Sequence, residues 1–167
     1  LTATAWVKAA PGTAGCVIDK YWAGAWNGWQ IWLSGGRVYA AYFVSTTRYV
    51  YDGDYILDGG WIDDGQWHHL AFVVDATGGR FYVDGTVRAT AGWTGAAGPC
   101  TTTLGLRFGV DDGVPFRGQI DEVTIWNTNL NATAVVQLMD SPPDTDDPTL
   151  LGYWDFEDGT GIQVTDR

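Results

Sequence analysis

Basic residues are scarce in this chain of 167 residues. Nine lysines and arginines stand against 20 acidic residues, which gives a formal net charge of −11 at neutral pH. Nucleic-acid binding and attachment to an anionic membrane surface both depend on clusters of Lys and Arg. The composition therefore excludes nucleic acid as a partner, and it excludes electrostatic binding to membranes.

Long apolar runs are lacking as well. A membrane-spanning helix needs about 20 consecutive, mostly apolar residues, and no stretch of the sequence approaches that length. The chain opens directly on a strand-like segment, without the basic and apolar regions of a signal peptide. We therefore expect no membrane insertion. We expect residues 1–167 to form a single domain of a larger secreted or cell-surface protein, with its signal sequence upstream.

Cysteine is rare, with only Cys16 and Cys100 in the chain. Two cysteines are too few for a structural zinc site, and neither lies in a Cys-x-x-Cys pair. A disulfide between them would suit an extracellular, oxidising compartment, and it would stabilise the fold by roughly 4–5 kcal/mol in the chain-entropy model. Two buried free thiols are the alternative.

Aromatic residues and glycine are abundant, at 14% of the chain and 23 residues respectively. Short runs of β-branched and aromatic residues alternate with turn signals, which is typical of an all-β sandwich or barrel. The expected strands cover residues 2–9, 16–21, 29–33, 37–44, 67–75, 80–83, 86–90, 103–108, 116–126 and 150–156.

Two tight hairpins and one helix complete the expected fold. Gly35-Gly36 and Asp84-Gly85 have the composition of two-residue hairpin turns, in which both positions need positive φ. The sequence also predicts a short helix near the C-terminus, over residues 132–139, capped by Asn131 and ended by Pro142-Pro143.

Four segments in order carry a family resemblance. They are Thr-Ala-Trp-Val-Lys at residues 4–8, Asp-Gly-Gln-Trp-His-His and the apolar run after it at 64–75, Arg-Phe-Tyr-Val-Asp-Gly at 80–85, and residues 116–127. Together they resemble the laminin-G-like jelly-roll domains of the concanavalin A-like lectin/glucanase superfamily. The resemblance implies two antiparallel sheets packed face to face. It also implies carbohydrate or adhesive binding, often with calcium.

The closing stretch, residues 152–161, resembles the strand at which such domains often begin. It can close the sheet of this domain or open a following unit, and the sequence leaves both alternatives open.

Catalytic signals are weak. Glucanases with this fold carry Glu-x-Asp-x-Glu on one strand, and nothing in the chain matches that motif. Asp121 and Glu122 are adjacent, so on a strand they point to opposite faces. Asp155 and Glu157 share a face and are the best pair for glycoside hydrolysis, which requires two facing carboxylates. We expect a chain that is not an enzyme, with a glycoside hydrolase or lyase as the remote alternative.

Aromatic residues in connections point instead to sugar binding. Pyranose rings stack on flat apolar side chains, and a few polar groups bind their hydroxyls. Two tryptophans flank Gly24 in a glycine-rich connection, and aromatic residues alternate with aspartates over residues 49–61. The expected carbohydrate-binding residues are Trp22, Trp26, Tyr51, Asp52, Asp54 and Trp61.

The leading hypothesis is therefore a non-catalytic carbohydrate-binding or adhesive module, with a glycan or polysaccharide as its partner. The main alternative is a structural or protein–protein interaction repeat, whose aromatic residues pack against a neighbouring protein domain. Under that alternative, the same rings simply cover the surface of the sandwich.

Calcium is a possible cofactor, because aspartate in loops is a favoured oxygen ligand for Ca²⁺. Asp111 and Asp112 lie in the loop before residue 116, and Asp121 follows on the next strand. If these residues bind the ion, it stabilises the folded state by mass action. The melting temperature should then rise in about 1 mM calcium and fall on chelation, and no shift in either direction would contradict the prediction.

Overall fold

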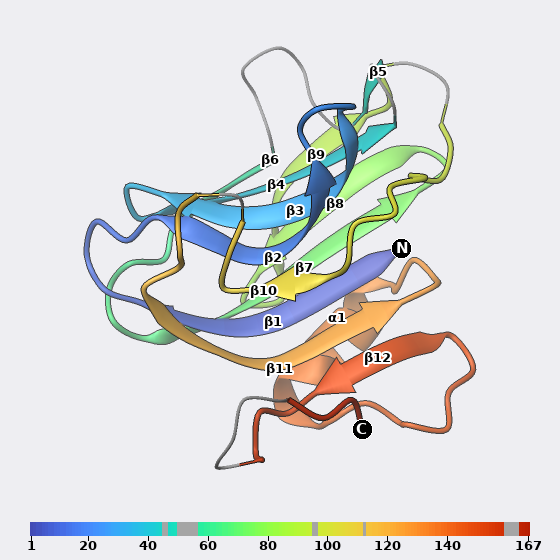
Figure 1. Cartoon of the computed structure of the whole chain (residues 1–167). Coiled ribbons are helices and arrows are strands. Elements are labelled where there is room, and N and C mark those ends of the chain that lie inside the picture. The colour runs from blue at the N-terminus through green and yellow to red at the C-terminus, as the bar shows by residue number, and fades with distance from the viewer. Residues whose placement is uncertain (45–46, 50–56, 95–96, 112, 159–163) are drawn as a thin grey trace.

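Two antiparallel sheets pack face to face in the computed structural model (Figure 1). The structure describes residues 1–44, 47–49, 57–94, 97–111, 113–158 and 164–167, and for residues 47–49 it describes the backbone only. The two-sheet sandwich confirms the predicted fold class. No helix in the part of the chain described is long and apolar enough to cross a membrane.

The first sheet, here sheet A, places the N-terminal strand near its centre. In order across the sheet, its strands are β12 (Leu150–Trp154), β11 (Gly118–Trp126), β1 (Thr2–Ala9), β7 (Trp67–Asp75), β8 (Gly78–Val83) and β9 (Thr86–Gly92). Because β12 pairs with β11, the closing stretch completes this sheet.

The second sheet, sheet B, is built around one long hairpin. Its strands in order are β10 (Arg107–Phe108), β2 (Gly15–Trp22), β3 (Asn27–Ser34), β4 (Arg37–Val44) and β5 (Thr47–Tyr49), and β6 (Leu57–Trp61) pairs with β4. The strands predicted from the sequence did not include β5 and β6. The strand expected over residues 103–108 is reduced to the two residues of β10.

The core lies between the sheets and follows the period-two alternation of strands. Alternate residues of β1, namely Ala3, Ala5 and Val7, are fully buried, and Ile31 and Leu33 of β3 face them from the other sheet. The intervening side chains of each strand point away from this core. Sheet B therefore has an inner face that packs and an outer face that sequence alternation assigns to solvent.

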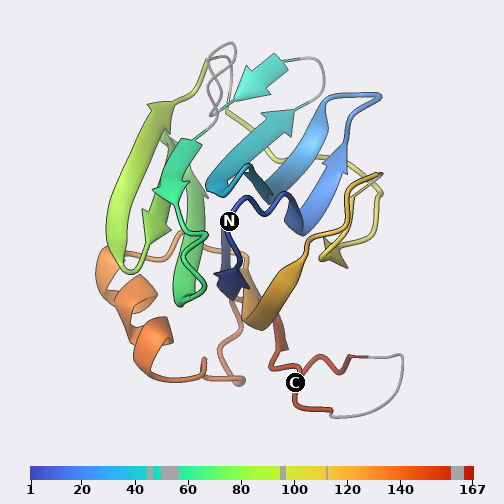
Figure 2. The same cartoon turned by 90° about the vertical axis from the view of Figure 1, so that its left-hand side faces the viewer.

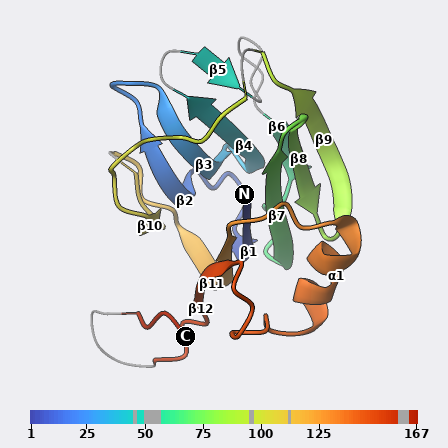
Figure 3. The ribbon, with the colours of Figure 1, turned by 90° about the vertical axis from the view of Figure 1, so that its right-hand side faces the viewer.

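The outer face of sheet A is partly covered by the helix α1 (Ala132–Asp140), as Figures 2 and 3 show. Asn131 Oδ1 accepts a hydrogen bond of 2.9 Å from the Ala134 backbone N–H, which confirms the predicted cap. Val135 is buried against Ala71 and Val73 of β7. The helix thus occupies one outer face, and the outer face of sheet B lies on the far side of the sandwich.

Both predicted hairpin turns are confirmed. Gly35 and Gly36 have φ values of 57° and 90°, and Asp84 and Gly85 have values of 52° and 70°. Positive φ at both central positions matches the twist of the flanking strands. The first turn sets Leu33 opposite Val38 in the ladder between β3 and β4.

The expected disulfide is absent, and both cysteines are free thiols. Cys16 pairs with Trp32 near one end of β3. Cys100 instead donates its backbone N–H to the Tyr42 hydroxyl, and Tyr42 lies opposite Trp29. Trp29 and Trp32 are three positions apart on β3, so their partners lie about 10 Å apart along the strand, which exceeds the reach of a disulfide.

One histidine is buried without a complete set of hydrogen bonds. His69 is 1% exposed, and its ring lies edge-on to Trp6 at 5.3 Å between centroids. Its Nδ1 has no hydrogen-bond partner among the residues described. Burial lowers the pKa of His69 to about 4, and the charge of Asp84 only partly opposes this effect.

This histidine should make the fold less stable in mild acid. The unfolded His69 takes up a proton near pH 6.5 and the folded one only near pH 4, so stability is lost as pH falls through that window. Between pH 7 and pH 5 the free energy of unfolding should fall by about 2 kcal/mol on account of His69.

Urea titrations at both pH values would measure the change, with a His69→Phe variant as control. The neighbouring residue His68 also titrates: burial acts to lower its pKa, but hydrogen bonds to Asp84 and Asp64 raise the pKa overall. His68 therefore contributes in the opposite direction, because its stabilisation is lost as pH rises. The difference between the wild type and the variant isolates His69, and an unchanged pH dependence in the variant would show that His69 is not responsible.

Candidate functional site

The outer face of sheet B carries aromatic side chains that the core does not use. Trp32 of β3 lies opposite Tyr39 of β4, and their rings stack at 5.6 Å between centroids with 29° between planes. Both side chains are only partly buried. The stacked pair forms a partly exposed apolar surface across two neighbouring strands.

A further exposed aromatic residue, Trp61, lies on the neighbouring strand β6. Trp61 of β6 pairs with Arg37 of β4 and is 64% exposed. The Arg37 guanidinium lies over the Trp61 ring, 5.1 Å from its centroid, and it also forms an ion pair with Asp58. The hydrogen bond from Arg37 to Asp58 raises the pKa of Arg37. The cation is thus held between a carboxylate and an aromatic face.

We refer to Trp32, Arg37, Tyr39, Asp58 and Trp61 as the aromatic patch. It combines aromatic rings with guanidinium N–H donors and carboxylate acceptors on the outer side of sheet B. Asp58 Oδ1 also accepts a hydrogen bond of 2.8 Å from the Gly60 backbone N–H, which fixes the carboxylate in place. Flat apolar groups beside a few oriented polar groups are the usual composition of a small-ligand site.

The connection between β2 and β3 presents the other aromatic residues expected from the sequence. Trp22 is 51% exposed at the end of β2. Trp26 is half-buried, with φ of 49°, and its ring lies edge-on to Phe43 at 5.8 Å. Phe43 also contacts Tyr21, at 4.8 Å. Trp22 is therefore available to a ligand, whereas Trp26 partly covers Phe43.

Of the four other residues expected to bind sugar, the structure describes only one. Trp61 belongs to the aromatic patch, and Tyr51, Asp52 and Asp54 lie outside the described residues. The patch adds Trp32, Arg37, Tyr39 and Asp58, which the sequence-based prediction did not include. Alternation along β3 carried a signal for Trp32, because Trp29, Ile31 and Leu33 point inward and leave Trp32 outward.

Of the three expected calcium ligands, the structure describes Asp111 and Asp121, and both accept backbone hydrogen bonds. Asp111 Oδ1 accepts hydrogen bonds from the backbone N–H groups of Gly113 and Val114, both at 2.9 Å. Asp121 Oδ1 accepts one from Glu122, and Asp112 lies outside the described residues. Within the described ranges, no three His, Cys, Asp or Glu side chains meet in a metal-binding arrangement.

Two of the carboxylates considered for catalysis, Asp155 and Glu122, hydrogen-bond to other side chains. Asp155 Oδ2 accepts a hydrogen bond of 2.8 Å from Arg167 Nε, which lowers the pKa of Asp155. Glu122, with φ of 49°, accepts a hydrogen bond of 2.5 Å from the Tyr153 hydroxyl. Asp155 and Glu157 also lie beyond the end of β12, so strand geometry does not pair them.

Comparison with known proteins gives one family and several similar structures. The family model for the concanavalin A-like lectin/glucanase superfamily matches residues 1–136. No curated protein sequence matches the chain.

Similar solved structures share the fold at low sequence identity. One is a candidate carbohydrate-binding protein from Bacteroides ovatus, with a TM-score of 0.70 and 14% identity, matched over 99% of this chain and 49% of that one. Another is botulinum neurotoxin type C, studied for its interaction with two ganglioside molecules, with a TM-score of 0.60, 12% identity and coverage of 86% and 36%. A third is the binding domain of botulinum neurotoxin DC in complex with rat synaptotagmin II, with a TM-score of 0.62, 11% identity and coverage of 87% and 36%. The chain thus spans about half of the first structure and about a third of the other two.

The structure separates surface tryptophans from core tryptophans in a way that stability measurements can check. Trp29 is 2% exposed, so Trp29→Ala should lower the free energy of unfolding by about 3–5 kcal/mol. Trp61→Ala should lower it by less than about 1 kcal/mol, because most of the ring already faces water. Urea denaturation would measure both, and equal losses would place Trp61 in the core.

Proposed function

Because the chain belongs to the concanavalin A-like lectin/glucanase superfamily, we propose that it is a non-catalytic glycan-binding module whose binding surface is the aromatic patch. One observation carries the proposal. Trp61 keeps 64% of its surface exposed. The Arg37 guanidinium lies over the Trp61 ring, and an ion pair with Asp58 holds the guanidinium there. A sugar ring can stack on the aromatic faces while its hydroxyls bind the guanidinium and the carboxylate.

The charge of the patch favours a neutral glycan. Arg37 and Asp58 neutralise each other, so the patch offers donors and acceptors without excess charge. The chain as a whole carries a net charge of −11, and its field repels sulfated and carboxylated polysaccharides. Trp22 is also exposed on sheet B, but it pairs with Asn27, five positions along β3 from Trp32, and lies apart from the patch.

The similar structures support a binding role in general terms. Two of them are described in connection with carbohydrate or ganglioside, and one was solved with a bound protein. Each is less than 25% identical, so the likeness is one of fold, and function is not inherited with it. Binding without catalysis is the better inference, because Asp155, Glu122 and Asp121 bind an arginine, a tyrosine and a backbone N–H respectively. A location outside the cell, within a secreted or surface protein, is part of the same proposal.

Affinity electrophoresis through gels containing neutral polysaccharides would test the proposal. The wild-type chain should be retarded by at least one of a panel of β-glucans, mannans and xylans. Trp61→Ala should weaken that retardation about tenfold, the equivalent of about 1.4 kcal/mol, because it removes a stacking face. Tyr39→Ala should act in the same direction.

A matched control is available on the other sheet. Trp67 of β7 is 39% exposed but lies on sheet A, so Trp67→Ala should leave retardation unchanged. If Trp67→Ala and Trp61→Ala weaken binding equally, the aromatic patch is not the site. If only Trp22→Ala weakens it, the tip of β2 binds the glycan without the patch.

A further inference from the structure

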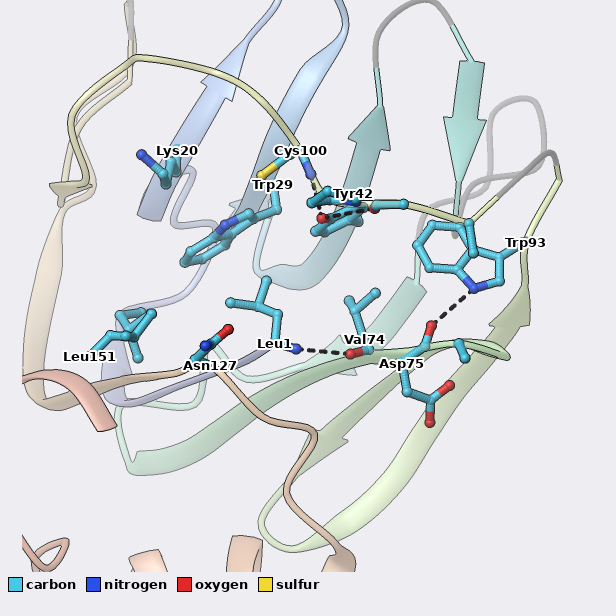
Figure 4. Close-up of a pocket in the computed structure, with 15 residues that line it drawn as sticks. Leu1, Lys20, Trp29, Tyr42, Val74, Asp75, Trp93, Cys100, Asn127 and Leu151 are labelled. Carbon is cyan, nitrogen blue, oxygen red and sulfur yellow. Dashed lines mark hydrogen bonds between the residues drawn. The ribbon is translucent and has the colours of Figure 1, made fainter. Parts of the chain in front are cut away.

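A cavity of about 610 Å³ opens between the two sheets at one end of the sandwich (Figure 4). Its roof is formed by Trp29 and Tyr42 of sheet B, and its floor by Leu1 and Val74 of sheet A. We call it the interlayer slot. Protein interiors contain few voids larger than a water molecule, whereas small-ligand sites measure roughly 300–1,000 Å³. The slot has the size of a binding site and exceeds an ordinary packing defect.

The walls of the slot are aromatic. Tyr42 and Trp93 meet edge to face, with 5.8 Å between centroids and 81° between planes. Trp29 lies beside Tyr42 on the neighbouring strand. Together these residues form a corner that presents ring faces and ring edges at once, which is the geometry in which a further flat ring packs favourably.

Hydrogen bonds hold the outer wall in place. The Trp93 indole N–H donates to the Asp75 carbonyl at 3.0 Å. The Tyr42 hydroxyl accepts from the Cys100 backbone N–H at 2.7 Å and donates to the Gly98 carbonyl at 3.3 Å. Trp93 is thus tied to sheet A, and Gly98 and Cys100 are tied to sheet B, so these walls of the slot are in place without a ligand.

Each charged group that lines the slot has a hydrogen-bond partner. The Leu1 α-amino group donates to the Val74 carbonyl at 3.0 Å. Lys20 Nζ donates to the Leu104 carbonyl at 2.7 Å. The Asp75 carboxylate accepts hydrogen bonds from Arg80 and from Thr77, and these contacts help to lower its pKa to about 2 although burial acts to raise it. An anionic ligand would have to displace these carbonyl contacts and enter against the field of a chain with a net charge of −11, and a cationic ligand would find the Asp75 carboxylate already paired with Arg80.

From this arrangement we infer that the interlayer slot binds a small, neutral molecule with a flat apolar ring system. The site lies on the inner side of sheet B and shares no residue with the aromatic patch, so it does not depend on the proposed glycan binding. Burial of apolar ligand surface against the three rings supplies the affinity, and the net charge of −11 disfavours anionic ligands.

The test uses N-phenyl-1-naphthylamine, a neutral two-ring fluorophore, and its sulfonated analogue 1-anilinonaphthalene-8-sulfonate. The neutral dye should bind the intact chain with enhanced emission, and the sulfonated dye should bind at least tenfold more weakly. Ala97 is exposed and lines the slot, so Ala97→Trp should fill the mouth and weaken binding of the neutral dye at least tenfold. Thr94→Trp adds the same ring to the same segment at an exposed position outside the lining, and it should leave binding unchanged.

The two cysteines provide a second readout that does not depend on a substitution. Cys100 lines the slot and is partly exposed, whereas Cys16 is fully buried and burial raises the pKa of its thiol. N-ethylmaleimide should therefore modify Cys100 first, and saturating neutral dye should slow that reaction several-fold. Equal binding of both dyes, equal binding by Ala97→Trp and the wild type, or unprotected Cys100 would each overturn the proposal.

If Ala97→Trp fails to fold, Leu151→Glu replaces it. Leu151 lines the slot at its rim and is largely exposed, so a charge there should weaken binding of the neutral dye several-fold without loss of structure. Unchanged binding in Leu151→Glu would count against the slot in the same way.

Discussion

A slip of one residue between β3 and β4 would exchange the two faces of sheet B, because side chains alternate along a strand with a period of two. The turn at Gly35 and Gly36 prevents that slip, since positive φ at both positions fits a two-residue hairpin. With the register fixed, Leu33 and Val38 meet in the core, and Trp32 and Tyr39 meet at the surface. The aromatic patch and the interlayer slot both follow from this one constraint.

The same turn shows how far the sequence predicts the site. A two-residue hairpin centred on Gly35-Gly36 already implies that Trp32 faces Tyr39, so half of the aromatic patch was within reach of the sequence. The other half was not, because β6 has no strand pattern and arrives after a long connection. A register irregularity between Val38 and Tyr39 then sets Asp58 opposite Tyr39, and no local signal in the sequence marks it.

Long-range placement explains the disulfide that the sequence suggested and the fold does not form. Cysteine spacing fixes the length of a loop, but the position of Cys100 depends on where the segment from Trp93 to Arg107 crosses the sandwich. The Tyr42 hydroxyl and the side chain of Asn27 bind that segment at one end of β3. Cys16 pairs at the other end, opposite Trp32. Strands, turns and the helix are local and were predicted well, whereas this crossing is set by tertiary hydrogen bonds.

Stability alone does not account for Arg37, Asp58 and Trp61. An exposed ion pair contributes about 0–1 kcal/mol, and an exposed cation–π contact contributes about 0.5–1 kcal/mol. The larger gain from burying Trp61 is not realised, because 64% of the residue stays in water. What the three residues achieve is a fixed geometry, in which a ring face and two polar groups are oriented before a ligand binds. Pre-organisation of this kind reduces the entropy lost on binding, and that is why the patch is better understood as a binding surface than as part of the packing.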